Sequence, residues 1–160
     1  MTEIKSIAIA AALSGMLTVL AMAQQATPPY GPPISLEQAK MVIAAAEAEA
    51  QKNNWPVAIT VVDSGGSAVA MHRMDNTQLG SIPVAEDKAR TSVLFRRPSK
   101  ALEDAVAGGG IGLRVLGLRG ATPYDGGVPL FVDGKLIGPW GSQACCRRKM
   151  ARSPMSRPTL

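Results

Sequence analysis

The chain contains 160 residues, of which 46% are apolar and 18% are charged, and its formal net charge is +5. The excess positive charge comes from the ends, since Gln24–Gly138 holds eleven basic and eleven acidic residues, so it does not indicate a nucleic-acid partner. The two cysteines are neighbours, which excludes a disulfide-stapled scaffold. The central part, about 115 residues long, is enough for one compact domain.

The first residues have the pattern of a secretory signal. Lys5 gives a positive start, Ile7–Leu20 is an apolar run, and Ala21–Ala23 supplies the small residues that a signal peptidase reads. The run is short for a membrane span. We therefore predict that residues 1–23 are a signal peptide and that the protein is periplasmic or secreted, without stable membrane insertion after cleavage. A retained anchor or a buried N-terminal helix is the alternative.

A leader and a helix come next. Residues 24–33 contain four prolines without periodicity, which predicts an extended, mobile leader. Ser35 and Gln38 form the pattern of a capping box, which predicts a helix over Leu36–Lys52. The polar side chains of this helix that should face water are Glu37, Lys40, Glu47 and Lys52.

Two strands and a second helix follow. Val57–Val62 is a β-branched run that predicts a strand, the glycines of Asp63–Gly66 predict a turn, and Ser67–His72 is expected to return as the paired strand. The next helix is expected to start after Ser81, with Pro83 tolerated in its first turn.

The last elements form a short helix and a hairpin. Ser99 is expected to cap the helix, which Gly108–Gly110 should end. The hairpin is predicted over Val128–Val132 and Lys135–Ile137, joined by the turn Asp133-Gly134. The order α-β-β-α-α-β-β, with a final helix expected after it, indicates an α/β sandwich whose antiparallel sheet is covered by helices.

The segment 139–160 does not continue this pattern. It shows no helical or strand period, carries five basic residues and no acid, and includes Cys145-Cys146. A basic tail can bind nucleic acid or anionic lipid, but an exported protein seldom meets nucleic acid, so we predict no nucleic-acid partner. An alternative is a frameshift: read two bases later, permitted codons give the rest of a strand and then an acidic helix. This hypothesis predicts an indel near the codons for Gly138 and Pro139.

Four stretches of the chain are distinctive when taken together: ISLEQAK (Ile34–Lys40), PVAITVVDSGG (Pro56–Gly66), RMDNTQLGSIPVAEDKART (Arg73–Thr91) and GGVPLFVDGKLIG (Gly126–Gly138). In these stretches the chain resembles the GlcG/HbpS-like family of small haem-binding proteins. The resemblance implies a single domain over residues 34–138, with a five-stranded antiparallel sheet flanked by helices and assembly as a homo-oligomer. In that family, exported relatives bind haem, and others lie in glycolate or diol operons or are fused to corrinoid adenosyltransferases.

A haem site needs an axial ligand, an apolar slot and cations for the propionates. His72 is the chain's single histidine, so it is the candidate iron ligand, and a surface histidine on an edge strand is the alternative. Strand alternation places His72 and Met71 on opposite faces. Met74 could be a weaker, soft ligand or a residue of the core, and Tyr124 could supply a phenolate ligand or serve in packing.

Cations are frequent near this candidate ligand. Lys88 lies on the inward stripe of the second helix, where it can meet a ligand or pair with a nearby acid. The N–H groups of the helix start at Ser81 would favour a carboxylate. We therefore predict a ligand-binding set made of His72, Arg73, Met74, Lys88 and Arg90.

Catalytic templates are absent from the sequence: there is no Ser-His-acid spacing, HExxH or phosphate loop. We predict an exported, non-enzymatic protein that binds haem for storage, sensing or scavenging, with no other metal indicated. The alternative is an enzyme or binding module for a small organic acid or a diol-derived metabolite. Its generic acid/base candidates would be Asp63, Asp75, Glu86 and Lys88.

Overall fold

The computed structural model describes residues 27–144, so the predictions for the signal peptide and for the tail beyond Ala144 lie outside the described residues. These residues form a single α/β domain. Its elements are α2 (Leu36–Lys52), β1 (Val57–Val62), β2 (Ala68–Arg73), α3 (Ser81–Leu94), α4 (Ser99–Ala107), the 3-10 helix η1 (Gly110–Gly117), β3 (Gly127–Val132) and β4 (Lys135–Ala144).

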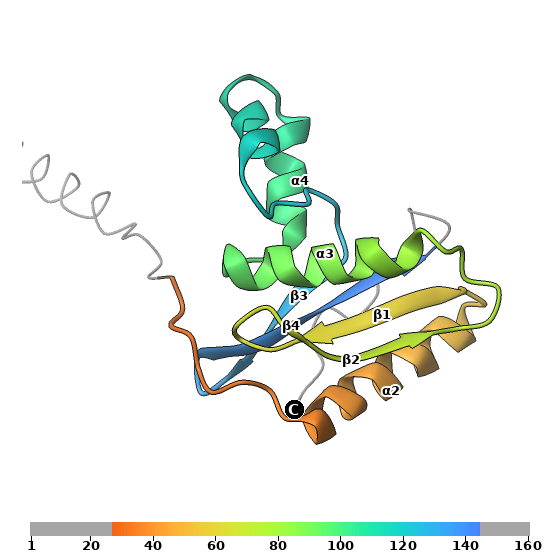
Figure 1. The fold of residues 1–160 in the computed structure, drawn as a ribbon. Helices are drawn as coiled ribbons and strands as arrows, with labels where there is room; N and C mark the ends of the chain where they lie inside the picture. Colours follow the sequence, from red (N-terminus) through yellow and green to blue (C-terminus); the bar gives the residue numbers. More distant parts are fainter. Residues whose placement is uncertain (1–26, 145–160) are drawn as a thin grey trace, which may run out of the picture.

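The sheet is antiparallel and has the strand order β2-β1-β4-β3. It has four strands within residues 27–144, so the expectation of five was wrong for this part of the chain. Helix α2 lies along one face and α3 along the other, while α4 and η1 project away from the sheet beyond α3 (Figure 1). Strands β2 and β3 are therefore the two edges, and β1 and β4 are central.

The sheet separates two cores. Val57, Ile59 and Val61 of β1 pack with the apolar face of α2. Val62 points to the other side and packs with Ala89 and Val93 of α3. Both faces of β1 are thus buried, and every residue of this strand is inaccessible to solvent.

Local signals placed the start of α2 correctly and those of α3 and α4 to within one residue. Ser35 Oγ accepts from the Gln38 N–H at 3.2 Å, and Gln38 Oε1 accepts from the Ser35 N–H at 3.0 Å, so the capping box of α2 is confirmed. Helix α3 was expected to start after Ser81 and begins at Ser81 itself. Ser99 does not cap α4 but is its first residue, and its hydroxyl bonds to β3.

Strand β4 is longer than expected. It was predicted to end at Ile137 but continues to Ala144, so the first residues of the segment that showed no period are a central strand. Residues Trp140–Ala144 pair with β1, and β3 covers the opposite side up to Gly141. Because nearly all of β4 is buried on both faces, its sequence has no polar–apolar alternation to read.

The described part of the leader is extended but fixed, which corrects the expectation of mobility. The Gly31 N–H donates to the Leu136 carbonyl at 2.8 Å, and the Leu136 N–H donates to the Pro29 carbonyl at 2.9 Å. The Tyr30 hydroxyl donates to the Val93 carbonyl at 2.9 Å, and the Arg96 guanidinium lies 5.2 Å from the Tyr30 ring centre. The leader therefore joins the start of β4 to the end of α3.

The base of α4 is tied to β3 by polar contacts. Ser99 Oγ accepts from the Gly127 N–H at 2.8 Å, and Glu103 Oε2 accepts from the Asp125 N–H at 2.8 Å. The Asp125 carboxyl is half-buried, and this burial raises its pKa above 3.8, opposed by a hydrogen bond from the Gly126 N–H. The folded state therefore holds the proton of this carboxyl more tightly than the unfolded chain does.

Asp125→Asn is expected to increase stability at neutral pH. A raised folded-state pKa means that the contribution of Asp125 is present at low pH and is lost as pH rises from about 4 through the folded-state pKa. The stability difference between Asp125→Asn and wild type should therefore grow from pH 4 to pH 7, measured by urea denaturation. A stability difference that stays constant from pH 4 to pH 7 would contradict the assignment.

Two glycines allow α3 to lie against the sheet. Gly127 of β3 and Gly141 of β4 are paired in register. A Cβ at Gly141 would come within 2.0 Å of the Ala85 carbonyl oxygen, and one at Gly127 within 2.2 Å of the Lys88 carbonyl oxygen. Backbone of α3 therefore rests directly on backbone of the sheet, a distance that no other residue type permits.

Gly141→Ala is expected to lower the free energy of unfolding by at least about 2 kcal/mol, because α3 must move away from β4 to admit a methyl group. Chemical denaturation measures the loss. Gly80→Ala is a matched control, because a Cβ at that position meets nothing within 4 Å. Equal stability of the two variants would show that α3 accommodates the methyl group without cost.

Candidate functional site

The most specific polar contact on the α2 face joins two elements far apart in sequence. His72 is on the edge strand β2, with its side chain 54% exposed, and its Nδ1 lies 2.8 Å from Glu47 Oε1 of α2. The register explains the meeting: His72 is opposite Ile59, which belongs to the core beneath α2. Cross-strand partners point to the same face, so the imidazole lies under the helix that carries Glu47.

This contact selects a tautomer. A carboxylate accepts hydrogen bonds, so Nδ1 carries the proton when the imidazole is neutral, and Nε2 carries the lone pair. Within residues 27–144, Nε2 has no hydrogen-bond partner. A histidine that gives its other N–H to a carboxylate is the usual arrangement of a metal ligand, because the carboxylate orients the ring and raises its basicity.

A depression lies about one helical turn beyond Glu47 along α2, and neither Glu47 nor His72 is among its lining residues. It has a volume of about 480 Å³ and is formed where α2 ends, β1 begins and β2 has just ended. Met74 belongs to its wall and packs on the α2-side core, so it shares a face with His72 two residues earlier. The lining residues are Ala50, Gln51, Asn54, Trp55, Pro56, Met74, Asp75 and Asn76.

The five predicted ligand-binding residues are not brought together. His72 and Met74 lie on the α2 side of the sheet, whereas Arg73, by strand alternation opposite Ala58, points to the α3 side. Lys88 and Arg90 are on α3, which covers that other side. Two of the five residues therefore share a face, and the other three are separated from them by the sheet.

The contacts of Lys88 and Arg90 are with protein groups. Lys88 points inward as predicted, is 4% exposed, and donates from Nζ to the Ser142 carbonyl at 3.2 Å and to Gln143 Oε1. Arg90 donates from Nε to the Gly66 carbonyl at 3.1 Å and forms an ion pair with Glu86 at 2.8 Å.

The start of α3 is also used internally. The Ser81 N–H donates to the Gln78 carbonyl at 3.0 Å, and the Ile82 N–H donates to the Leu79 carbonyl at 3.3 Å. Two of the helix-start donors that were expected to attract a carboxylate are therefore already engaged.

Two residues of the site were missed from sequence. Glu47 was assigned to the water-facing side of its helix, and its partner His72 is 25 residues away, so no local pattern connects them. Trp55, which follows the turn that ends α2, was not predicted as a site residue. Its one signal in the sequence is that a large aromatic residue stands between a helix end and a strand.

Residues 27–144 contain no group of three or more His, Cys, Asp or Glu side chains arranged to hold a metal ion. None of the helices in this range has the length and apolarity that a membrane crossing needs.

Comparison with known proteins agrees with this fold and these motifs. Residues 34–142 match the model of the family "Haem degrading protein HbpS-like". Protein GlcG of Escherichia coli (strain K12) is 42% identical over 108 residues, which cover 68% of this chain and 79% of the relative.

Solved structures show the same architecture. The structure of a PduOC:heme complex has a TM-score of 0.64 and 29% identity, covering 72% of this chain and 85% of that one. A double mutant of HbpS from Streptomyces reticuli has a TM-score of 0.66 over 78% of this chain and 84% of that one; at 24% identity this likeness concerns the fold. The resemblance to the GlcG/HbpS-like proteins is confirmed, and this chain belongs to the HbpS-like family.

Proposed function

We propose that this protein binds haem through His72 and acts as an exported store, sensor or scavenger of it. The observation that carries the proposal is the His72–Glu47 pair, which leaves Nε2 as an iron ligand on an accessible edge strand. The PduOC:heme complex among the structural relatives supports the choice of ligand. Export rests on the signal pattern of residues 1–23.

The residues present fit such a group. Haem supplies an iron with an axial position that an imidazole nitrogen can fill. Glu47 would hold the His72 ring and keep Nδ1 protonated, and Glu47 is itself fixed on the regular helix α2. The depression at the end of α2, whose wall includes Trp55, Pro56 and Met74, offers apolar surface to a large flat ligand.

Haemin added to the full chain is expected to give a shifted Soret band that saturates. His72→Ala should abolish this shift, because the chain has no other histidine. Glu47→Gln should weaken binding about 10- to 100-fold, since the ring loses its charged orienting partner. Glu37→Gln, a change of the same kind at an exposed position of the same helix, is the control and should leave affinity unchanged.

Two results would count against this assignment. A titration that reproduces the spectrum of free haemin would remove haem as the ligand. An unchanged spectrum in His72→Ala would remove His72 as the iron ligand while keeping haem as the ligand.

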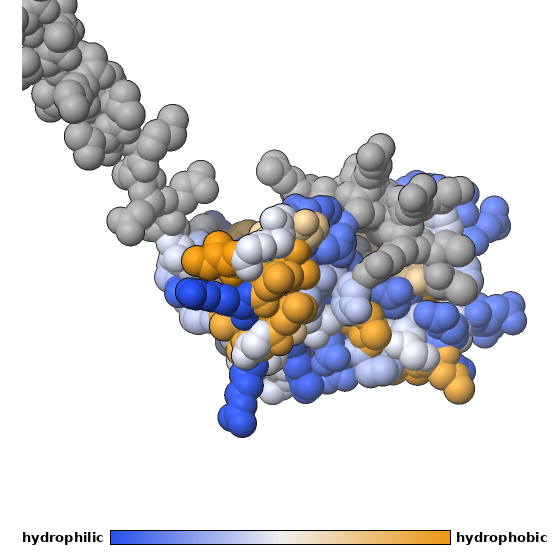
Figure 2. Space-filling model, turned by 90° about the horizontal axis from the view of Figure 1, so that it is seen from above, coloured by the Kyte–Doolittle hydropathy of each residue, from blue (hydrophilic) through white to orange (hydrophobic). Residues whose placement is uncertain are grey.

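The homo-oligomer expected from the family is supported by the surface of the arm formed by α4 and η1. Within η1 no residue is buried, and Ile111 and Leu116 are 77% and 63% exposed. Figure 2, which looks down on the side from which the arm projects, shows apolar residues gathered there. A projecting element with this much exposed aliphatic surface is typical of a protein contact, and we propose that a second copy covers it.

Leu116→Glu is expected to shift the protein to a smaller mass in size-exclusion chromatography with light scattering, because it places a charge in the proposed contact. Leu36→Glu is the control, since Leu36 is 53% exposed on α2, away from the arm. A wild-type protein that is monomeric at all concentrations would contradict the assembly. An unchanged oligomer in Leu116→Glu would place the contact elsewhere.

Binding of a small organic acid remains the second hypothesis, but no contact in the described residues favours it. The groups expected to bind it, on Lys88, Arg90 and the start of α3, are engaged with protein carbonyls, amides and acids.

A further inference from the structure

The depression at the end of α2 is built on two rigid turns. At the first, Asn54 adopts a left-handed conformation with φ 53°, and the Trp55 N–H donates to the Ala50 carbonyl at 2.9 Å. This is the geometry of a helix that ends in a left-handed residue. It fixes the backbone of Trp55 relative to the last turn of the helix.

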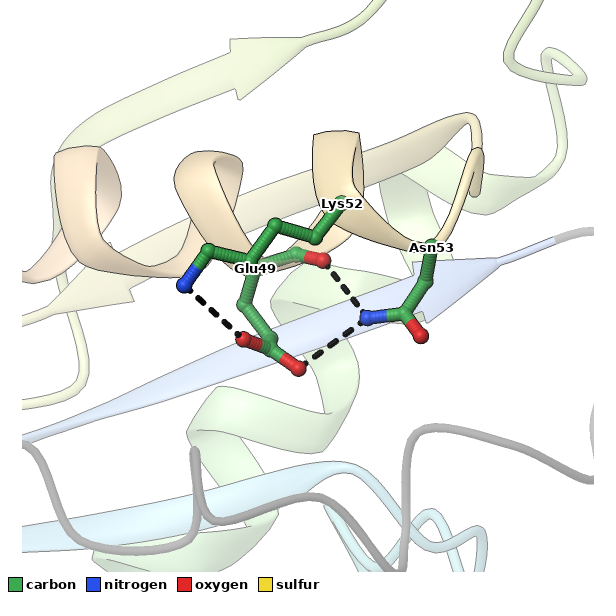
Figure 3. Close-up of polar contacts among 3 residues, drawn as sticks. All are labelled: Glu49, Lys52 and Asn53. Carbon is green, nitrogen blue, oxygen red and sulfur yellow. Dashed lines mark hydrogen bonds and ion pairs between the residues drawn. The ribbon is translucent and has the colours of Figure 1, made fainter.

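A side-chain network reinforces this turn. Asn53 Nδ2 donates to the Glu49 carbonyl at 2.8 Å and to Glu49 Oε1 at 3.0 Å, while Lys52 Nζ lies 3.8 Å from Glu49 Oε2 (Figure 3). The figure shows the three side chains gathered on one side of the helix end. One wall of the depression is therefore held before any ligand arrives.

The opposite wall is fixed to β1. The Met74 N–H donates to the Val57 carbonyl at 3.0 Å, and the buried Thr77 donates from Oγ1 to the same carbonyl at 3.1 Å. Between them, Asn76 is left-handed with φ 61°. Two of the four left-handed non-glycine residues in the described part of the chain thus line one depression, and both are Asn, whose short polar side chain tolerates this conformation.

The surface chemistry of the depression suits a flat, largely apolar ligand with polar groups at its edge. Trp55, Pro56 and Met74 give an aromatic and aliphatic wall, and the volume of about 480 Å³ lies within the usual range of small-molecule sites, roughly 300–1,000 Å³. Gln51, Asn54 and Asn76 provide amide N–H donors for carboxylates. Asp75 is the lining residue that would repel them.

We infer that Trp55, Pro56 and Met74 form the seat for the ring of a porphyrin, an inference that rests on the proposed function. Met74 lies on the same face of the sheet as His72 and two residues further along the chain, while His72 itself is not a lining residue of the depression. In this proposal the porphyrin ring and the iron are bound by different residues, so the contribution of each to binding can be measured separately.

The test uses protoporphyrin IX, which has the ring and carboxylates but no iron. It is titrated into the full chain and followed by its fluorescence anisotropy, in parallel with the Soret titration of haemin. Trp55→Ala should weaken the binding of both ligands about tenfold or more. His72→Ala should lose the haemin shift, and it should weaken the binding of protoporphyrin IX less than Trp55→Ala does.

A charge substitution at the exposed Asp75 gives a second test of the seat and does not disturb the core. Asp75→Lys should bind protoporphyrin IX about three- to tenfold more tightly, because a repulsion of its carboxylates becomes an attraction. Asp87→Lys makes the same charge change at an exposed position of α3, on the other side of the sheet, and should have no effect. If Trp55→Ala does not fold, judged by circular dichroism, this pair decides.

The seat is overturned if wild type does not bind protoporphyrin IX, or if binding is the same in Trp55→Ala and Asp75→Lys as in wild type. If the seat is rejected in this way but the haemin shift still depends on His72, the proposed function stands and the seat alone is wrong. If protoporphyrin IX binds in a Trp55-dependent way but haemin gives no shift, the seat is supported and iron ligation by His72 is rejected.

Discussion

The closeness of α3 to the sheet is the constraint on which the rest of the domain depends. The paired Gly127 and Gly141 let the carbonyl oxygens of Lys88 and Ala85 approach within distances that exclude any Cβ. This contact closes the α3 face over β3 and β4, and Lys88 is buried there. The depression described above lies on the other side of the sheet, at the edge where α2 ends.

The two faces of the sheet therefore have different roles. On the α3 side, small residues and hydroxyl-bearing residues bring backbones together and join the arm to β3. On the α2 side, the helix covers β1 and β2 but stops at Lys52, and the chain must turn back to enter β1. The depression at the end of α2 is a direct result of this turn, since its walls are the two chain reversals that flank Val57.

Much of the fold could be predicted because its signals are local. The capping box at Ser35 and the turn Asp133-Gly134, where both residues have positive φ, act over a few residues and were read correctly. The end of β4 was missed because a strand buried on both sides has no period to detect. The pairing of Glu47 with His72 depends on strand register and helix placement together. His72 could therefore be predicted as a candidate ligand from sequence, but its partner Glu47 could not.

The leader has a consequence for how the domain is delimited. The match to the family model starts at residue 34, yet Pro28, Pro29, Tyr30 and Gly31 already bond to Arg96, Leu136 and Val93. A recombinant fragment cut at the start of the match would lose the cover over the beginning of β4 and the acceptor group for Arg96. The segment by which the family is recognised is thus narrower than the unit that folds, and expression boundaries should be drawn upstream of Pro28.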